Sequence, residues 1–120
     1  MALTLDGYSA NEDGIVEIKL STVSGSLKLS IPDERIKSPY DLLYPTLGED
    51  GLDTAEWQGN QVQTGEDDEE GDTVKRKGIK LDIPRSALMT YVGKTVDLFF
   101  VTSGESGKTT SEPLRIKVQE

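Results

Sequence analysis

Residues 79–83 read Ile-Lys-Leu-Asp-Ile, an alternation of apolar and charged side chains. This period of two is typical of a β-strand that rests one face on a core and turns the other toward water. Two more stretches have the same pattern, residues 16–20 (Val-Glu-Ile-Lys-Leu) and residues 114–118 (Leu-Arg-Ile-Lys-Val). Half-buried strands are therefore expected along the whole chain, which favours a fold built from sheets.

Two further segments extend this pattern. Residues 96–101, Val-Asp-Leu-Phe-Phe-Val, are apolar on nearly both faces and predict a central strand with a neighbour on each side. Residues 27–31, Leu-Lys-Leu-Ser-Ile, follow the strand at 16–20 after a turn that contains Ser24-Gly25. This arrangement predicts a hairpin between the two strands.

Turn-forming residues separate these segments, with twelve glycines and five prolines in 120 residues. Clusters at residues 11–14, 48–51, 59–60 and 103–107 recur at the spacing of short strands. We therefore predict an all-β fold, an antiparallel β-sandwich of about seven strands in two sheets, with a small barrel as the alternative. A chain of this length fits one domain, assigned here to residues 1–120.

Two short segments allow a helical turn. Residues 83–92 run from Pro84, suited to a first helical turn, to Gly93, suited to the residue after a helix. Residues 38–45 start with Ser38 as a candidate cap and stop at Pro45, so they are either a second helical turn or a strand. The predicted core combines the inward-facing strand residues with the single tryptophan: Val16, Ile18, Leu20, Leu29, Trp57, Ile79, Leu81, Val96, Leu98, Phe100, Leu114, Ile116 and Val118.

The composition argues against an enzyme. The chain contains no histidine and no cysteine, which removes the commonest general base, the thiol nucleophile and the usual transition-metal ligands. Residues 104–109, Gly-Glu-Ser-Gly-Lys-Thr, resemble the end of a phosphate-binding loop, but Thr102 stands where that motif needs glycine and a strand pattern follows. We expect a β-hairpin loop there, and no catalytic residue, cofactor or metal site.

The net charge of −9 is concentrated between residues 49 and 72, which contain no lysine or arginine. Without a basic face, the chain is not expected to bind nucleic acid. Within this region, residues 65–72 carry contiguous acids that lack the ligand spacing of a calcium loop, so we expect a mobile, solvated loop without tightly bound ions. The basic residues 75–77 follow at once and are expected to neutralise part of its charge.

The aromatic residues allow a different function. Tyr8, Tyr40, Tyr44, Tyr91 and Trp57 are the residue types from which a sugar-stacking platform is built. A lone tryptophan at the end of a strand in a small sandwich is more often part of the core, which we expect for Trp57. A carbohydrate-binding module is therefore the alternative function.

Several short motifs resemble the Ig-like repeats of large bacterial surface and adhesin-type proteins. The similarity covers residues 38–118 and lies in these segments: Tyr44-Pro45, Asp50-Gly51, Trp57-Gln58-Gly59, Ile83-Pro84, Ala87-Leu88, Gly93-Lys94-Thr95-Val96 and Ser111-Glu112-Pro113-Leu114. The resemblance implies an Ig-like β-sandwich without catalytic residues. It also favours the strand over the helical turn at residues 38–45.

The resemblance further implies a spacer or adhesive repeat within a longer extracellular or cell-surface protein. Its expected partners are neighbouring repeats or a host or cell-surface macromolecule, and we expect a monomer in isolation. No apolar run approaches the roughly 20 residues of a membrane helix, so membrane insertion is not expected. The first residues have neither the basic region nor the long apolar stretch of a signal peptide.

Overall fold

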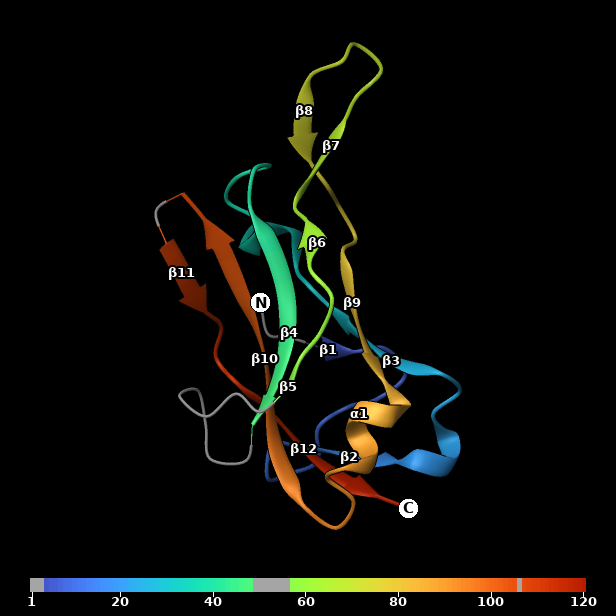
Figure 1. Ribbon diagram of the computed structural model, residues 1–120. Coiled ribbons are helices and arrows are strands. Elements are labelled where there is room, and N and C mark those ends of the chain that lie inside the picture. Colours follow the sequence, from blue (N-terminus) through green and yellow to red (C-terminus); the bar gives the residue numbers. More distant parts are fainter. Residues whose placement is uncertain (1–3, 49–56, 106) are drawn as a thin grey trace.

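The computed structural model describes residues 4–48, 57–105 and 107–120, and these form an all-β sandwich (Figure 1). The molecule is elongated, with extents of 48 × 28 × 27 Å. The smaller face of the sandwich is a sheet of three strands in the order β1 (Thr4–Leu5), β3 (Ser26–Ser30) and β9 (Lys80–Pro84).

The larger face is a sheet of seven strands. Its spatial order is β2 (Ile15–Lys19), β12 (Leu114–Gln119), β10 (Thr95–Gly104), β4 (Leu42–Gly48) and β5 (Trp57–Gln58). In addition, β6 (Val62–Gln63) pairs with β4 on the same side as β5, farther along the strand. In the same way, β11 (Gly107–Thr110) pairs with β10 on the same side as β12, farther along that strand. A third, two-stranded sheet consists of β7 (Gly65–Asp67) and β8 (Thr73–Lys75).

One apolar cluster joins the two larger sheets, and the alternating segments supply it. Ile79, Leu81 and Ile83 are at most 2% exposed, as the alternation predicts. Eleven of the thirteen predicted core residues are buried, while Trp57 and Leu114 are half-buried and pack against the cluster. The hydrophobic period therefore identified both the strands and the faces that they bury.

The central strand is β10, as predicted. It pairs with β4 on one side and with β12 and then β11 on the other. Leu98 and its neighbours on the inner face belong to the main core, whereas Phe99 and Val101 on the outer face form a second buried cluster with Tyr44. Asp97 also lies on the outer face, where it is buried and accepts a 3.3 Å hydrogen bond from Arg115. Burial on both faces explains why this strand reads as a nearly continuous apolar run.

The predicted hairpin of residues 16–20 and 27–31 is wrong, because its two strands belong to different sheets. A 3₁₀ turn, η1 (Leu20–Thr22), begins where β2 ends; Leu20, its first residue, and Val23, the residue after it, are buried. The connection, which includes Gly25 at φ 96°, therefore crosses the core from one sheet to the other. Serine and glycine favour a turn both in a hairpin and in a connection between two sheets, so they do not indicate which sheet the next strand joins.

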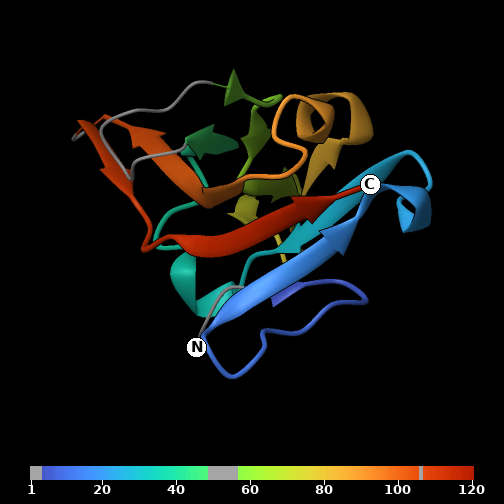
Figure 2. The ribbon, with the colours of Figure 1, turned by 90° about the horizontal axis from the view of Figure 1, so that it is seen from below.

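The predicted antiparallel sandwich is confirmed, with one parallel pair among its described strands. Antiparallel pairing of β12 with β10 is confirmed, with Val96 opposite Ile116. On its other side β12 pairs parallel with β2, with Ile116 opposite Val16 (Figure 2). Alternation of side chains is identical in both directions, so it cannot indicate strand direction.

The segment at residues 38–45 forms a turn followed by β4, so the strand prediction is confirmed from Leu42 onward. Pro45 lies inside β4, and its carbonyl accepts a 2.8 Å hydrogen bond from the Gly59 amide. The nitrogen of Pro45 points to the same side of β4 as its carbonyl. On that side the ladder is interrupted, because β5 has ended and β6 has not yet begun. A missing N–H is therefore tolerated in the middle of the sheet.

The other helical prediction is confirmed in part. Helix α1 (Arg85–Met89) follows Pro84 as expected, but it ends with Thr90 as its C-cap. Gly93, at φ 83°, therefore lies in the turn before β10 and not directly after the helix. A second 3₁₀ turn, η2 (Asp33–Arg35), lies between β3 and β4.

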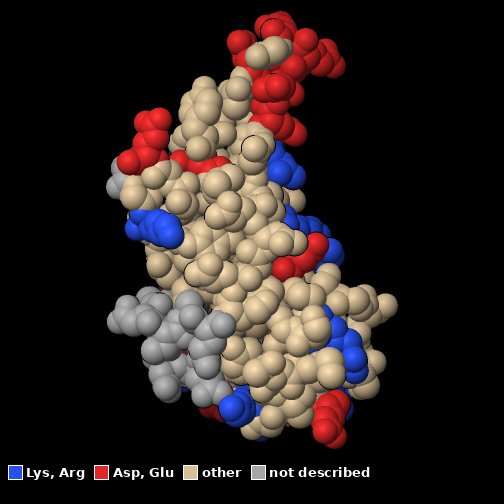
Figure 3. Space-filling model, viewed as in Figure 1, with Lys and Arg blue, Asp and Glu red and all other residues tan. Residues whose placement is uncertain are grey.

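The acidic residues 65–72 are a correction to the predicted loop, because the first three of them form β7 and pair with β8. The tip of this hairpin is closed by Asp68, whose Oδ1 accepts hydrogen bonds from the amides of Glu70 and Asp72. The hairpin extends beyond the body of the molecule and carries a dense group of acidic side chains (Figure 3). Residues 65–67 are therefore in a strand, where charge density alone predicted a loop.

Candidate functional site

A groove with Trp57 in its wall lies where the edges of the two larger sheets approach each other. Trp57 lines two adjacent hollows, of about 380 and 400 Å³. The first hollow is also lined by Ser26, Gln58, Gly59, Asn60, Asp82 and Pro84. The second is also lined by residues in or beside α1: Ser86, Ala87, Thr90 and Tyr91. We call these two hollows together the Trp57 groove.

The orientation of the indole follows from the register of β5. Trp57 is opposite Leu47 of β4, so its side chain lies on the inner face of the sheet and packs against the core. Gly59 closes over the ring: a Cβ at that position would lie 2.8 Å from Cη2 of Trp57 and 2.6 Å from Cγ of Pro45. Only glycine fits there without displacing the ring or the proline.

The indole N–H remains available to a ligand. The described residues contain no buried side-chain N or O atom without a hydrogen-bond partner. No hydrogen bond of Trp57 occurs among those residues either, so Nε1 is accessible to solvent. The core prediction for Trp57 is therefore correct for one side of the ring, while its half-exposure leaves the other side in the groove.

The remaining aromatic residues do not form a platform with it. Tyr44 is buried on the outer face of the larger sheet, Tyr91 is buried beneath the second hollow, and Tyr8 is half-buried. Tyr40 is 74% exposed and lines a separate hollow at the base of the acidic hairpin. The polar residues of the groove, Asn60 and Asp82, were not singled out from the sequence, because one lies in a turn and the other on the solvent face of a strand.

A second, smaller pocket of about 200 Å³ lies near the β10–β11 hairpin. Its polar lining combines the cations Arg35 and Lys37 with Asp41 and with threonines of three segments, Thr64, Thr102 and Thr109. Thr64 is buried, and its hydroxyl donates to the carbonyl of Ser38 at 2.7 Å. The polar groups at this position therefore hold the turn before β4 in place.

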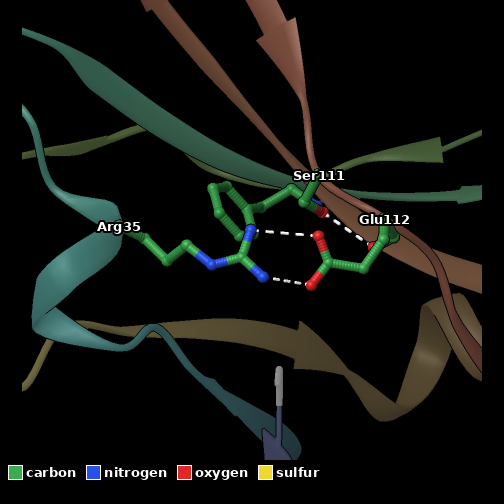
Figure 4. A network of polar contacts seen from close by, with 4 residues as sticks. Arg35, Ser111 and Glu112 are labelled. Atoms are coloured by element: carbon green, nitrogen blue, oxygen red, sulfur yellow. Dashed lines mark hydrogen bonds and ion pairs between the residues drawn. The ribbon is translucent and has the colours of Figure 1, made fainter. Parts of the chain in front are cut away.

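Arg35 at the edge of that pocket makes a bidentate ion pair with Glu112 (Figure 4). Nη1 donates to Oε2 at 3.0 Å and Nη2 donates to Oε1. The hydrogen bond from Arg35 lowers the pKa of the Glu112 carboxyl below its usual value, and the same bond raises the pKa of the guanidinium. The neighbouring Ser111 accepts a 3.0 Å hydrogen bond from the buried amide of Phe100. This network joins η2 to the segment before β12 and is structural.

The described parts of the acidic and glycine-rich motifs lie in two separate hairpins, β7–β8 and β10–β11. Within the described ranges, no group of three or more acidic residues is arranged to hold a metal ion. No ion pair in that part of the chain joins the acidic tip to Lys75–Lys77; Arg76 instead donates to the carbonyl of Gln63 at 3.1 Å. Of residues 104–109, Gly104 ends β10 and residues 107–109 belong to β11, so these described residues lie in a β-hairpin, as predicted.

Two findings bear on the class of protein. Comparisons with protein-family models, with curated protein sequences and with solved structures found no match to this chain. In the parts of the chain that the structure describes, no helix has the length and apolar character needed to cross a membrane. The fold and the groove therefore define an all-β sandwich with a candidate binding surface.

Proposed function

We propose that this chain is a non-catalytic Ig-like module that serves as a spacer or adhesive repeat within a larger bacterial surface or secreted protein. Its partners are then neighbouring repeats or a macromolecule on a cell surface, and the isolated module is a monomer. The motif resemblance over residues 38–118 and the lack of histidine and cysteine support this proposal. A repeat in such a protein must transmit tension between its neighbours without unfolding.

The observation that carries the proposal is the parallel pairing of β2 with β12. The pairs run from Ile15 opposite Arg115 to Lys19 opposite Gln119. Tension on the two ends of the chain pulls β2 from its first residue and β12 from its last, in opposite directions along the strands. All the hydrogen bonds of this ladder are therefore loaded together in shear. The two-residue strand β1 precedes it and gives little resistance of its own.

The test compares two pulling directions in single-molecule force experiments. Handles at the two ends of the chain load the β2–β12 ladder in shear. Handles at a Lys19→Cys substitution and at the C-terminus pull from the same end of both strands and peel the bonds one at a time; the chain has no cysteine, so the new thiol is unique. Forced unfolding is governed by the unfolding rate, so we expect a severalfold higher force for the end-to-end pull.

The thermal transition of the Lys19→Cys variant, measured without force, is the control and should match that of the unmodified chain, because Lys19 is exposed. Equal unfolding forces in the two directions would contradict the role as a force-bearing spacer.

A further inference from the structure

The Trp57 groove combines the chemical groups that recognise a sugar ring. The C–H face of a pyranose packs on an aromatic ring, while its hydroxyls need donors and acceptors at the edge of that ring. The exposed side of Trp57 supplies the first, and Asn60 and Asp82 line the same hollow. The indole Nε1–H adds one more donor, and Ser86 and Thr90 add hydroxyls in the second hollow.

These polar groups are available rather than committed to the fold. Asn60 is exposed, and its side chain makes no hydrogen bond within the described residues. Asp82 uses Oδ1 in an ion pair with Lys28 across the strands β3 and β9, which leaves Oδ2 for a ligand hydroxyl. The Lys28 pair also holds the carboxylate in position.

The groove is preformed by regular structure. Gly59 and Pro45 fix the ring of Trp57 from one side, and β9 is fixed by its ladder with β3. Helix α1 follows directly from β9 and supplies the wall of the second hollow. Each hollow has a volume in the range of small-molecule sites, and the two share the tryptophan. Little ordering is therefore needed on binding.

From this arrangement we propose that the Trp57 groove binds a neutral saccharide chain, with one sugar ring packed on the indole and the adjoining part of the chain in the second hollow. The charge decides between neutral and acidic sugars. Among the described residues, the lining of the groove contains the carboxylate of Asp82 and no lysine or arginine, so a sulfated or uronic-acid chain is repelled. This inference goes beyond the spacer role, which stands or falls with the force experiment.

The single tryptophan makes the experiment specific to this site. The full chain is titrated with neutral hexasaccharides of β-1,4-glucose, β-1,4-N-acetylglucosamine, α-1,4-glucose and β-1,4-mannose, with heparin as the charged comparison. We expect at least one neutral chain to shift the emission of Trp57 and to protect it from acrylamide, and heparin to do neither.

Two variants place the ligand in the groove. Asn60→Ala and Asp82→Asn each remove a hydrogen-bonding or charged group, and each should weaken binding by about three- to tenfold. Gln61→Ala and Asp13→Asn change the same kinds of side chain at exposed positions outside the groove and should leave the affinity unchanged. Melting temperatures of all four variants confirm that they are folded.

The proposal is overturned if no neutral hexasaccharide protects Trp57 at tens of millimolar concentration. It is equally overturned if heparin binds as well as the neutral chains, or if the two groove variants bind as tightly as the two controls.

Discussion

The amide of Gly59 donates a 2.8 Å hydrogen bond to the carbonyl of Pro45, at the point where β5 stops and β6 has not yet begun. This one bond continues the ladder past a residue that has no N–H of its own. It also brings the Gly59 backbone against the proline ring and the indole of Trp57. Strand continuity and the orientation of the only tryptophan therefore depend on the same contact.

We expect Gly59→Ala to be destabilising, because the new methyl group would lie 2.6 Å from Cγ of Pro45 and 2.8 Å from Cη2 of Trp57. Overpacking of this kind costs about 1–3 kcal/mol. Urea unfolding followed by the fluorescence of Trp57 measures the loss. The neighbouring Asn60→Ala is exposed and should change the free energy of unfolding by less than about 0.5 kcal/mol. Equal stabilities of the two variants would contradict the close approach at Gly59.

The alternation of apolar residues predicted the strands and their buried faces. Successive side chains of a strand point to opposite faces, so a strand with one buried face alternates apolar and polar residues. It did not predict which strands pair. Residues 16–20 alternate identically whether they pair with residues 27–31 as a hairpin or with residues 114–118 in parallel. The choice depends on the connection, where a 3₁₀ turn with the buried Leu20 leads the chain across the core.

The candidate site was only partly predictable for a related reason. Trp57 was predicted as a core residue and as one of five aromatic candidates for sugar stacking, and both interpretations rest on its size and aromatic character. Neither Asn60 nor Asp82 belongs to a sequence motif that would predict a binding residue. They come together because β9 of the smaller sheet lies beside β5 of the larger one, which is a tertiary arrangement between segments far apart in the chain.

The ion pair of Arg35 and Glu112, 77 residues apart in the chain, makes stability depend on pH at the acidic end. The pKa of Glu112 is lowered in the folded state, mainly by the hydrogen bond from Arg35. Its contribution is therefore complete above the ordinary glutamate pKa of about 4.3 and is lost as the pH falls through the lower, folded value. Hydrogen bonds from Lys80 and Ser30 lower the pKa of the Asp6 carboxyl in the same direction.

Glu112→Gln tests this dependence. The side chain of Glu112 is 51% exposed, so solvent screening limits the loss at pH 7 to below about 1 kcal/mol. The difference in unfolding free energy between the unmodified chain and the variant should shrink as the pH is lowered below about 4. Urea unfolding at a series of pH values measures it, and a difference that stays constant down to pH 2 would contradict the assignment.

The acidic hairpin should not bind calcium tightly. The two backbone amides of Glu70 and Asp72 already occupy Oδ1 of Asp68 at the tip, and the strands direct successive carboxylates to opposite faces. A cation that binds only the folded state raises the melting temperature. We therefore expect millimolar calcium to leave the melting temperature unmoved, with an equal ionic strength of sodium chloride as the control. A clear rise specific to calcium would contradict this expectation.

Removal of β12 should unfold the domain. A chain that ends at Pro113 loses the buried side chains of Ile116 and Val118 and the half-buried Leu114. Each buried side chain contributes roughly 1.5–3 kcal/mol, and the whole domain is stable by only about 5–15 kcal/mol. Because β12 lies between β10 and β2, two ladders are lost as well, and β2 is left without its neighbour in the sheet.

Circular dichroism and Trp57 fluorescence should therefore show no cooperative thermal transition for the chain that ends at Pro113. A chain that ends at Val118 keeps all three apolar residues and is the matched control, with a transition close to that of the full chain. Deletion of residues 1–5 should have a smaller effect than the loss of β12, because β1 is short and contributes only Leu5 to the core. If the chain ending at Pro113 kept a transition near that of the full chain, both the position of β12 between β2 and β10 and the spacer role built on its pairing with β2 would be wrong.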